Sequence, residues 1–191
     1  IPNQVKTIFS QGISLYLGQS NSNTIRVGDD WLNTGVAWPT DLNCHNYAVV
    51  RTTTDTYLYL DGALVASAGF AISSPSEGEP PMMTANTIAR FYIGAQWSGP
   101  GTEPWKGDVD ELRIWNRPLC SDEILATMNC EIPTSGPGLI ANYHFNQGFD
   151  GVDNTSATTL FDESGNSNDA TLVNMTLTGI SSNWIADGAV S

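Results

Sequence analysis

The sequence is poor in basic residues. Its 191 residues include 7 Lys and Arg against 20 Asp and Glu, which gives a formal net charge of −13. A surface with this charge repels phosphate backbones and anionic lipid headgroups, so we expect no nucleic-acid partner. The same excess of carboxylates attracts hard divalent cations, which keeps calcium binding open.

Several sequence features that mark common functions are also missing. No apolar stretch approaches the roughly 20 residues that a membrane-spanning helix needs, so we expect no membrane insertion. His45 and His144 have no second His or Cys at zinc-ligand spacing, which argues against zinc. No glycine-rich phosphate loop and no serine nucleophile motif is present.

Cysteine is scarce, and its odd count allows at most one internal disulfide. Cys120 and Cys130 flank SDEILATMN, which is typical of a short helix. A helical rise of about 1.5 Å per residue would hold the two more than ~10 Å apart, beyond the ~7 Å that a disulfide spans. The expectation is therefore a bridge between Cys44 and Cys130, or no bridge and buried free thiols.

Thr, Asn, Ser and Gly are abundant, as in proteins built from short strands and tight turns. The clearest strands are Tyr47–Val50, Thr56–Leu60 and Ala63–Ser67. Asp61-Gly62 between the last two supplies the positive φ angles of a two-residue hairpin turn.

Further along the chain, loops alternate with short elements. Residues 72–88 and 95–105 are polar loops with Gly and Pro, and residues 131–138 look like a linker. One helix is predicted at Ser121–Met128, capped by Cys120 or Ser121. Strands at near-regular spacing predict an all-β fold, a two-sheet antiparallel jelly-roll sandwich with one short helix.

The stretch GDVDELRIWNRPLCSDEI raises the question of catalysis. A retaining glucanase needs two carboxylates about 5–5.5 Å apart on one sheet face. If the stretch is a strand, Asp108 and Asp110 share one face and Glu111 takes the other. No second Glu completes a pair on this strand, so we interpret the carboxylates as part of the architecture and predict no enzymatic activity.

The same stretch resembles the signature of LamG-like domains, the laminin G and pentraxin relatives with a concanavalin A-like jelly roll. YAVVRTTTDTYLYLDGALVA resembles their central hairpin, and FYIGAQ the strand that follows. GLIANYHFNQG and DESGNSNDATL resemble another strand and loop of these domains, so the likeness covers residues 45 to 175. The resemblance implies a bacterial protein that is secreted or displayed on the cell surface.

The chain departs from the family pattern in order and in two residues. Cys44 stands where the family usually has Trp, and Cys120 replaces the capping Ser. The block from residue 139 usually begins such a domain, yet here it comes last. We expect one domain over residues 1–191 in which 139–191 complete the sheets, with a domain boundary near 131–138 as the alternative. Because the chain opens without Met in a strand-like segment, we expect a piece of a longer chain with neighbouring domains.

A calcium site is the first ligand hypothesis, since laminin G and pentraxin relatives commonly hold this ion. The loop DESGNSND offers oxygen ligands, and Asp108 and Asp110 could join them only if the two segments meet. The alternative is a loop whose side chains satisfy their own backbone. The candidate ligands in the loop are Asp162, Asn166, Asn168 and Asp169.

Sugar binding needs an exposed aromatic ring beside hydrogen-bonding groups. Trp97 with Gln96 is the first candidate, and Trp31 and Trp38 come next, whereas Trp105 and Trp115 are expected in the core. The sequence therefore predicts a carbohydrate-binding or adhesion module whose partner is a glycan, a polysaccharide or a surface glycoprotein. If the calcium hypothesis holds, this binding depends on calcium. A structural spacer or protein-interaction domain of an adhesin is the alternative, and a glycan hydrolase is the third.

Overall fold

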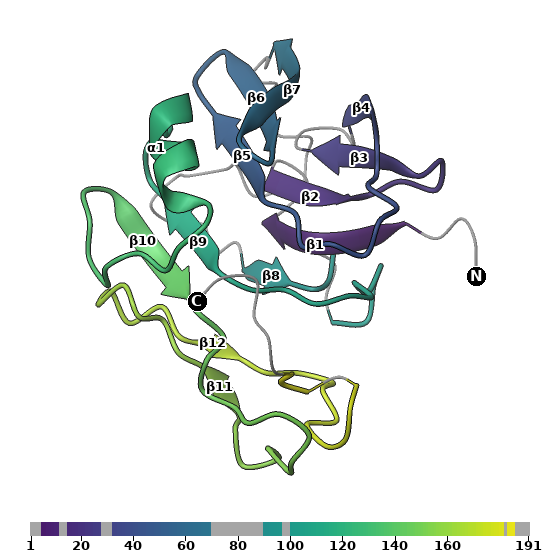
Figure 1. Cartoon of the computed structure of the whole chain (residues 1–191), viewed down its shortest axis with the longest axis vertical. Helices are drawn as coiled ribbons and strands as arrows, with labels where there is room; N and C mark the ends of the chain where they lie inside the picture. The colour runs from purple at the N-terminus through teal and green to yellow at the C-terminus, as the bar shows by residue number, and fades with distance from the viewer. Residues whose placement is uncertain are drawn as a thin grey trace. The chain divides into compact units, whose positions relative to one another are not determined.

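The computed structural model describes residues 5–11, 15–27, 32–69, 90–96, 100–181 and 183–185. The chain divides into two compact units, Ile1–Gly107 and Asp108–Ser191. All paired strands of the described residues are antiparallel, and the helix among them is short (Figure 1). The predicted all-β sandwich with one short helix is confirmed. The prediction of one domain over residues 1–191 stays a prediction.

The first unit contains a five-stranded sheet, and its central strands supply the buried side chains. Tyr16, Leu17, Ile25 and Val27 are its most deeply buried large side chains, each at most 2% exposed. Burial raises the pKa of the Tyr16 hydroxyl. In spatial order the strands are β4 (Leu32–Ala37), β3 (Thr24–Val27), β2 (Leu15–Gln19), β1 (Lys6–Gln11) and β8 (Phe91–Ile93).

A three-stranded sheet faces the five-stranded one. It consists of β5 (Tyr47–Arg51), β6 (Asp55–Leu60) and β7 (Ala63–Gly69), paired in that order. Leu60 pairs with Ala63, and Asp61 (φ 50°) and Gly62 (φ 76°) form the turn between them, which confirms the predicted hairpin.

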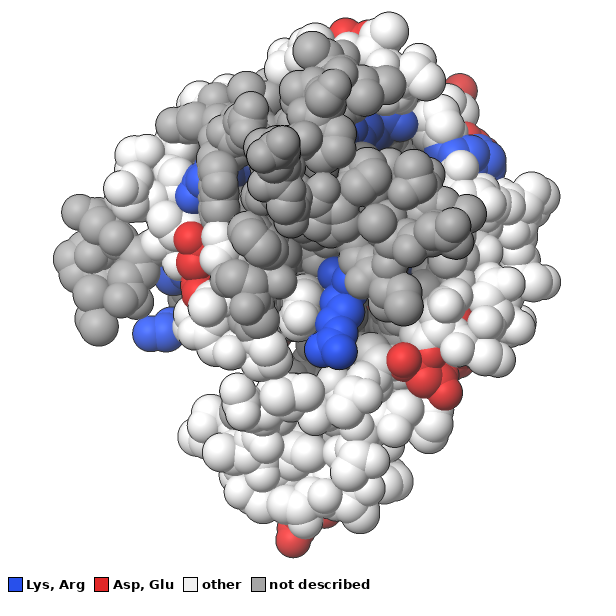
Figure 2. All heavy atoms as spheres, turned by 180° about the vertical axis from the view of Figure 1, so that it is seen from behind, with Lys and Arg blue, Asp and Glu red and all other residues white. Residues whose placement is uncertain are grey.

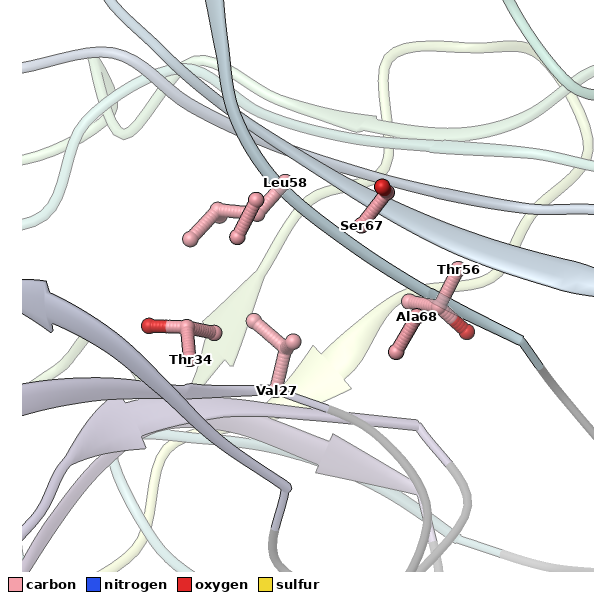
Figure 3. A pocket seen from close by; sticks show the side chains of 7 residues that line it. Val27, Thr34, Thr56, Leu58, Ser67 and Ala68 are labelled. Atoms are coloured by element: carbon pink, nitrogen blue, oxygen red, sulfur yellow. The ribbon is translucent and has the colours of Figure 1, made fainter.

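A small cavity separates the two sheets at one edge (Figure 3). Val27 and Thr34 line it from the five-stranded sheet, and Thr56 and Leu58 from the three-stranded one. Because Leu58 is only 1% exposed and points into this space, the two sheets share an apolar interior. This is the layered arrangement that the sequence predicts.

The second unit begins with the acidic stretch and two paired strands. β9 (Leu112–Trp115) pairs antiparallel with β10 (Leu139–Tyr143), although the segment 131–138 lies between them in the sequence. The strand starts only at Leu112, and Glu111 before it has a left-handed φ of 51°. The prediction that Asp108, Asp110 and Glu111 alternate on two faces of a strand is therefore wrong. The turn at Glu111 aims its side chain independently of any strand periodicity.

The predicted helix is present as α1 (Ser121–Thr127), with Cys120 at its N-cap. The Glu123 carboxylate accepts the Cys120 backbone N–H at 2.9 Å and both terminal nitrogens of Arg117 at 3.0 and 2.7 Å. The Arg117 hydrogen bonds, with the Cys120 N–H second, lower the pKa of Glu123 to about 2. Cys44, Cys120 and Cys130 are all free and exposed, so the expectation of buried thiols is wrong.

The rest of the second unit has a small apolar interior. Its strands β11 (Thr159–Leu160) and β12 (Ala170–Thr171) are short, and Leu160 and Leu177 are the buried large apolar residues between 149 and 181. Few charged side chains lie on the face of this region seen at the bottom of Figure 2. Side-chain hydrogen bonds link parts of this segment, among them those from Asn154 to the Phe149 carbonyl and to Asn183. Its exposed large apolar residues are Phe149, Val152, Phe161, Val173, Met175 and Ile180.

Among the residues described, no helix has the length and apolar character needed to cross a membrane.

Candidate functional site

Three aromatic side chains of the first unit stack on one another. The rings of Trp38 and Tyr47 lie 5.1 Å apart at 17°, and those of Trp38 and Trp105 lie 5.3 Å apart at 55°. All three residues are half-buried, so each leaves part of its surface to solvent. We call Trp38, Tyr47 and Trp105 the aromatic cluster.

Backbone hydrogen bonds fix the aromatic cluster in place. The Trp38 N–H donates to the Asn23 carbonyl at 2.9 Å, and the Trp105 N–H donates to the Gly94 carbonyl at 3.0 Å. Tyr47 is the first residue of β5. These bonds hold the backbone of the cluster, and the ring contacts of Trp38 with Tyr47 and Trp105 hold the side chains against one another.

A charged group adjoins the aromatic cluster through Tyr47. His45 contacts the Tyr47 ring edge-on at 6.5 Å, and its Nδ1 and Nε2 lie 2.8 Å from Asp61 and 2.9 Å from Asp41. Hydrogen bonding to Asp61, and then to Asp41, raises the pKa of His45. With a carboxylate at each ring nitrogen, the doubly protonated imidazolium is the form that donates to both.

Both carboxylates of this group are also tied to backbone. Asp61 accepts the Asn46 N–H at 2.9 Å and Asp41 accepts the Asn43 N–H at 2.9 Å. The Asn43 N–H, followed by the His45 hydrogen bond, lowers the pKa of Asp41. The side chains of Asp41 and Asp61 remain 52% and 50% exposed, so their free acceptor positions face solvent. The site therefore combines fixed rings with exposed carboxylates.

The predicted sugar-binding residues are only partly brought together. Trp38 is in the aromatic cluster, whereas Gln96 lies in a turn where its backbone exchanges hydrogen bonds with Thr102. Trp31 and Trp97 lie outside the described residues. Trp105, expected in the core, is half-buried and joins Trp38.

Sequence reasoning missed Tyr47 and Trp105 as members of the site. In the sequence, a strand pattern explains Tyr47 and the neighbouring signature stretch explains Trp105, so neither residue stands out as a ligand contact. Only their distance from Trp38 in space shows the cluster, and no short-range pattern encodes that distance. Trp115, also expected in the core, is half-buried beneath Arg117, whose guanidinium lies 5.5 Å from the ring centre.

Asp162, the first predicted calcium ligand, is a hydrogen-bond hub in the second unit. Its Oδ1 accepts the N–H groups of Asn142 and Ser164, each at 2.9 Å. Its Oδ2 accepts the Asn168 N–H and the Ser164 hydroxyl, each at 2.9 Å. Burial opposes ionisation of Asp162, but the three N–H groups outweigh it and lower its pKa.

The other predicted calcium ligands serve the same loop. Asn166 and Asn168 donate their amides to the Ile140 carbonyl at 3.0 and 2.9 Å, and Asp169 accepts the Asp162 N–H at 2.8 Å. The contacts match the alternative in which the loop satisfies backbone groups. A cation would have to displace N–H donors from Asp162, so these residues do not fit calcium as they lie. Calcium binding stays a prediction.

Asp108 and Asp110 are the two predicted ligands outside that loop. Asp108 is exposed, and Asp110 accepts the Glu111 N–H at 3.0 Å. Among the described residues, the metal-ligating groups that do converge are Glu111, Glu131 and His144, a set that contains none of the predicted ligands.

Comparison with known proteins adds family information to this geometry. The chain is similar over residues 2–125 to the family described as the concanavalin A-like lectin/glucanases superfamily. No curated protein matches the sequence.

Two solved structures are similar. A protein from Bacteroides ovatus, provisionally described as carbohydrate binding, is 18% identical with a TM-score of 0.65, and the match covers 89% of this chain. The chain spans about half of that structure, 48% of its length, and the likeness concerns the fold alone. An S-layer domain-containing protein from Clostridium thermocellum is 19% identical with a TM-score of 0.37, and the match covers 65% of this chain and 63% of that one.

The family match covers well over half of the sequence, and the antiparallel sandwich agrees with it. The chain therefore belongs to the concanavalin A-like lectin/glucanase superfamily.

Proposed function

We propose that the chain is a non-catalytic carbohydrate-binding module of a secreted or cell-surface protein, and that the aromatic cluster is its sugar platform. The observation that supports this most is the stacking of Trp38 with Tyr47 and Trp105 in half-exposed positions beside Asp41, His45 and Asp61. The family, which includes lectins, is consistent with the proposal.

The chemistry of a sugar fits both parts of this site. The C–H groups of a pyranose ring form an apolar face that packs on an aromatic ring. Its hydroxyls need acceptors, and the half-exposed carboxylates of Asp41 and Asp61 supply them. Because a neutral sugar brings no charge, the acidic surface does not repel it. Adhesion to a polysaccharide or a surface glycoprotein follows from the same contacts.

The proposal is tested first by screening the fluorescently labelled chain on an array of β-glucans, xylans, mannans, pectins and animal-type glycans. The strongest soluble oligosaccharide is then titrated into Trp38→Ala and into Trp115→Phe, a control in the other unit. We expect affinity to fall about tenfold or more in Trp38→Ala, the size of a lost aromatic anchor, and to be unchanged in the control.

A negative array, or equal affinity for wild type and Trp38→Ala, would contradict the proposal. Circular dichroism of each variant shows whether it is folded. If Trp38→Ala unfolds, Trp38→Phe replaces it, because the smaller ring keeps the contact with Tyr47 and loses part of the stacking area. No binding at all would favour the spacer or protein-interaction role.

One observation favours glycan hydrolysis as a second candidate. Sequence reasoning found no second glutamate for Glu111, yet Glu131 lies close enough for one oxygen of each carboxylate to fall within 4.8 Å of the other. Retaining glycosidases hold their carboxylates about 5–5.5 Å apart. Glu111 is nevertheless engaged by Arg113 at 2.5 Å and by His144 at 2.7 Å. Release of reducing ends from β-glucan, abolished in Glu131→Gln, would establish hydrolysis.

A further inference from the structure

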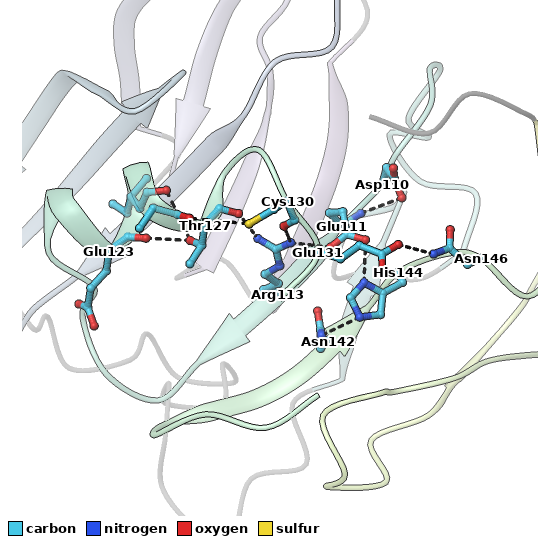
Figure 4. A network of polar contacts seen from close by, with 12 residues as sticks. Asp110, Glu111, Arg113, Glu123, Thr127, Cys130, Glu131, Asn142, His144 and Asn146 are labelled. Carbon is cyan, nitrogen blue, oxygen red and sulfur yellow. Dashed lines mark hydrogen bonds and ion pairs between the residues drawn. The ribbon is translucent and has the colours of Figure 1, made fainter. Parts of the chain in front are cut away.

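Three metal-ligating side chains from separate segments of the second unit converge on one point (Figure 4). Glu111 directly precedes β9, Glu131 follows the helix α1, and His144 directly follows β10. One ligand atom from each lies within 4.8 Å of the other two, and His144 Nδ1 is 2.7 Å from Glu111 Oε1. Small side-chain movements would bring all three atoms to the ~2.0–2.2 Å bond lengths of a zinc ion.

Each of the three side chains has its own outer partner. Arg113 donates to Glu111 Oε2 at 2.5 Å, which leaves Oε1 directed at His144. The Asn146 amide donates to Glu131 Oε1 at 2.7 Å, and the Asn142 amide lies 3.0 Å from His144 Nε2. Outer partners of this kind orient metal ligands and set the tautomer of a ligating histidine.

The burial of the cluster gives it a closed side and an open side. His144 is 4% exposed and Asn142 is 0% exposed, whereas Glu131 is exposed to solvent. Glu131 therefore lies on the solvent side of the three ligands and His144 on the buried side. The interior has low dielectric, which strengthens the bonds of a captured cation.

A buried oxygen without a partner is the second sign of a ligand site. Asn142 Oδ1 makes no hydrogen bond within the part of the chain that the structure describes. An ion bound at His144 Nδ1 requires the proton on Nε2, and that N–H then needs an acceptor. Rotation of the Asn142 amide by half a turn brings Oδ1 to His144 Nε2 as the acceptor and turns the NH2 group to the place that Oδ1 now occupies.

We propose that Glu111, Glu131 and His144 form a binding site for a divalent transition-metal ion, with Zn²⁺ preferred over Ca²⁺. One imidazole nitrogen and two carboxylates are a ligand set suited to zinc, whereas calcium takes six to eight oxygens. The Arg113 cation offsets one of the two carboxylate charges. This weakens the binding of Ca²⁺, which relies on the charge of its oxygen ligands, more than that of Zn²⁺, which also binds the imidazole nitrogen. Three protein ligands leave a fourth tetrahedral position for water or an external ligand.

The test is isothermal titration of Zn²⁺ and, separately, Ca²⁺ into the metal-stripped full chain. The thiols are first alkylated, because all three cysteines are exposed and would bind zinc. Glu131→Gln is the informative variant, since its remaining oxygen still accepts from Asn146 and its exposed position spares the core. Glu163→Gln, an exposed glutamate of the same unit, is the control.

We expect one Zn²⁺ per chain, bound at least tenfold more tightly than Ca²⁺. Affinity should fall about tenfold or more in Glu131→Gln and stay unchanged in Glu163→Gln. Absence of saturable zinc binding below about 1 mM, equal affinity in Glu131→Gln and wild type, or tighter binding of calcium would each overturn the proposal. The result is independent of the sugar site, whose residues belong to the first unit.

Discussion

Replacing His45 by Gln should remove a pH-dependent contribution to the stability of the first unit. His45 joins Asp41, in the segment after β4, to Asp61 in the hairpin turn between β6 and β7. Its pKa is raised in the folded state by these two hydrogen bonds, in the order Asp61 and then Asp41. A raised folded pKa means that the stabilisation is complete below the unfolded value of about 6.5 and is lost as pH rises through the folded pKa.

The size of this effect follows from the exposure of the partners. The His45 side chain is 18% exposed, but Asp41 and Asp61 are 52% and 50% exposed, so water screens both pairs. An exposed pair contributes about 0.2–1 kcal/mol, so the pair of His45 with Asp61 contributes at most about 1 kcal/mol. In a unit of this size, 1 kcal/mol corresponds to a change of roughly 4 °C in melting temperature.

The measurement is thermal unfolding followed by near-ultraviolet circular dichroism between pH 5.0 and 8.5 at constant ionic strength. Wild type and His45→Gln are compared at each pH. His144 is present in both proteins, so the difference between the two curves isolates His45. We expect wild type to melt roughly 4 °C above the variant at pH 5.0, and the gap to narrow above pH 6.5.

Two results would refute this reasoning. If the difference in melting temperature between wild type and His45→Gln were the same at every pH, His45 would act by packing against Tyr47 and not by its charge. A gap that widens with increasing pH would reverse the sign of the linkage and would require a neutral imidazole in the folded state.

Two further predictions concern the second unit. Asp162→Asn places an amide group against the Asn168 N–H and the Ser164 hydroxyl, so it should destabilise this unit by about 2 kcal/mol, measured by urea unfolding. Because the pKa of Asp162 is lowered in the folded state, wild type should lose the stabilisation from this carboxylate as pH falls below about 4. The variant lacks the carboxylate and should not show this loss. Equal loss of stability in acid for both proteins would contradict the role of Asp162. If the loop at 162–169 holds calcium as the sequence predicts, a chelator should lower the melting temperature, and an unchanged melt would exclude calcium there.

Local patterns in the sequence predict the elements of the fold well. The hairpin at Asp61-Gly62 and the helix after Cys120 both depend on residues next to one another, and both are present. Propensity, capping and turn chemistry act over a few residues, so they can be read from a single sequence.

Contacts between distant segments are what the sequence does not reveal. The left-handed turn at Glu111 removes its side chain from the strand alternation on which the prediction relied. Glu131 and His144 then meet Glu111 from two other segments, with no regular spacing among the three. The pairing of Trp38 with Trp105 is hidden for the same reason. Such sites depend on how strands and turns are placed in space.

The most direct test of the sugar-binding proposal is to observe the tryptophans while a glycan binds. Protein carrying ¹⁵N-labelled tryptophan gives one indole signal from each of its 6 tryptophans, assigned by single Trp→Phe substitutions. On titration with the strongest oligosaccharide from the array, we predict that the Trp38 and Trp105 signals shift in proportion to saturation, while Trp115 stays unchanged. Shifts confined to tryptophans other than Trp38 and Trp105 would contradict the account.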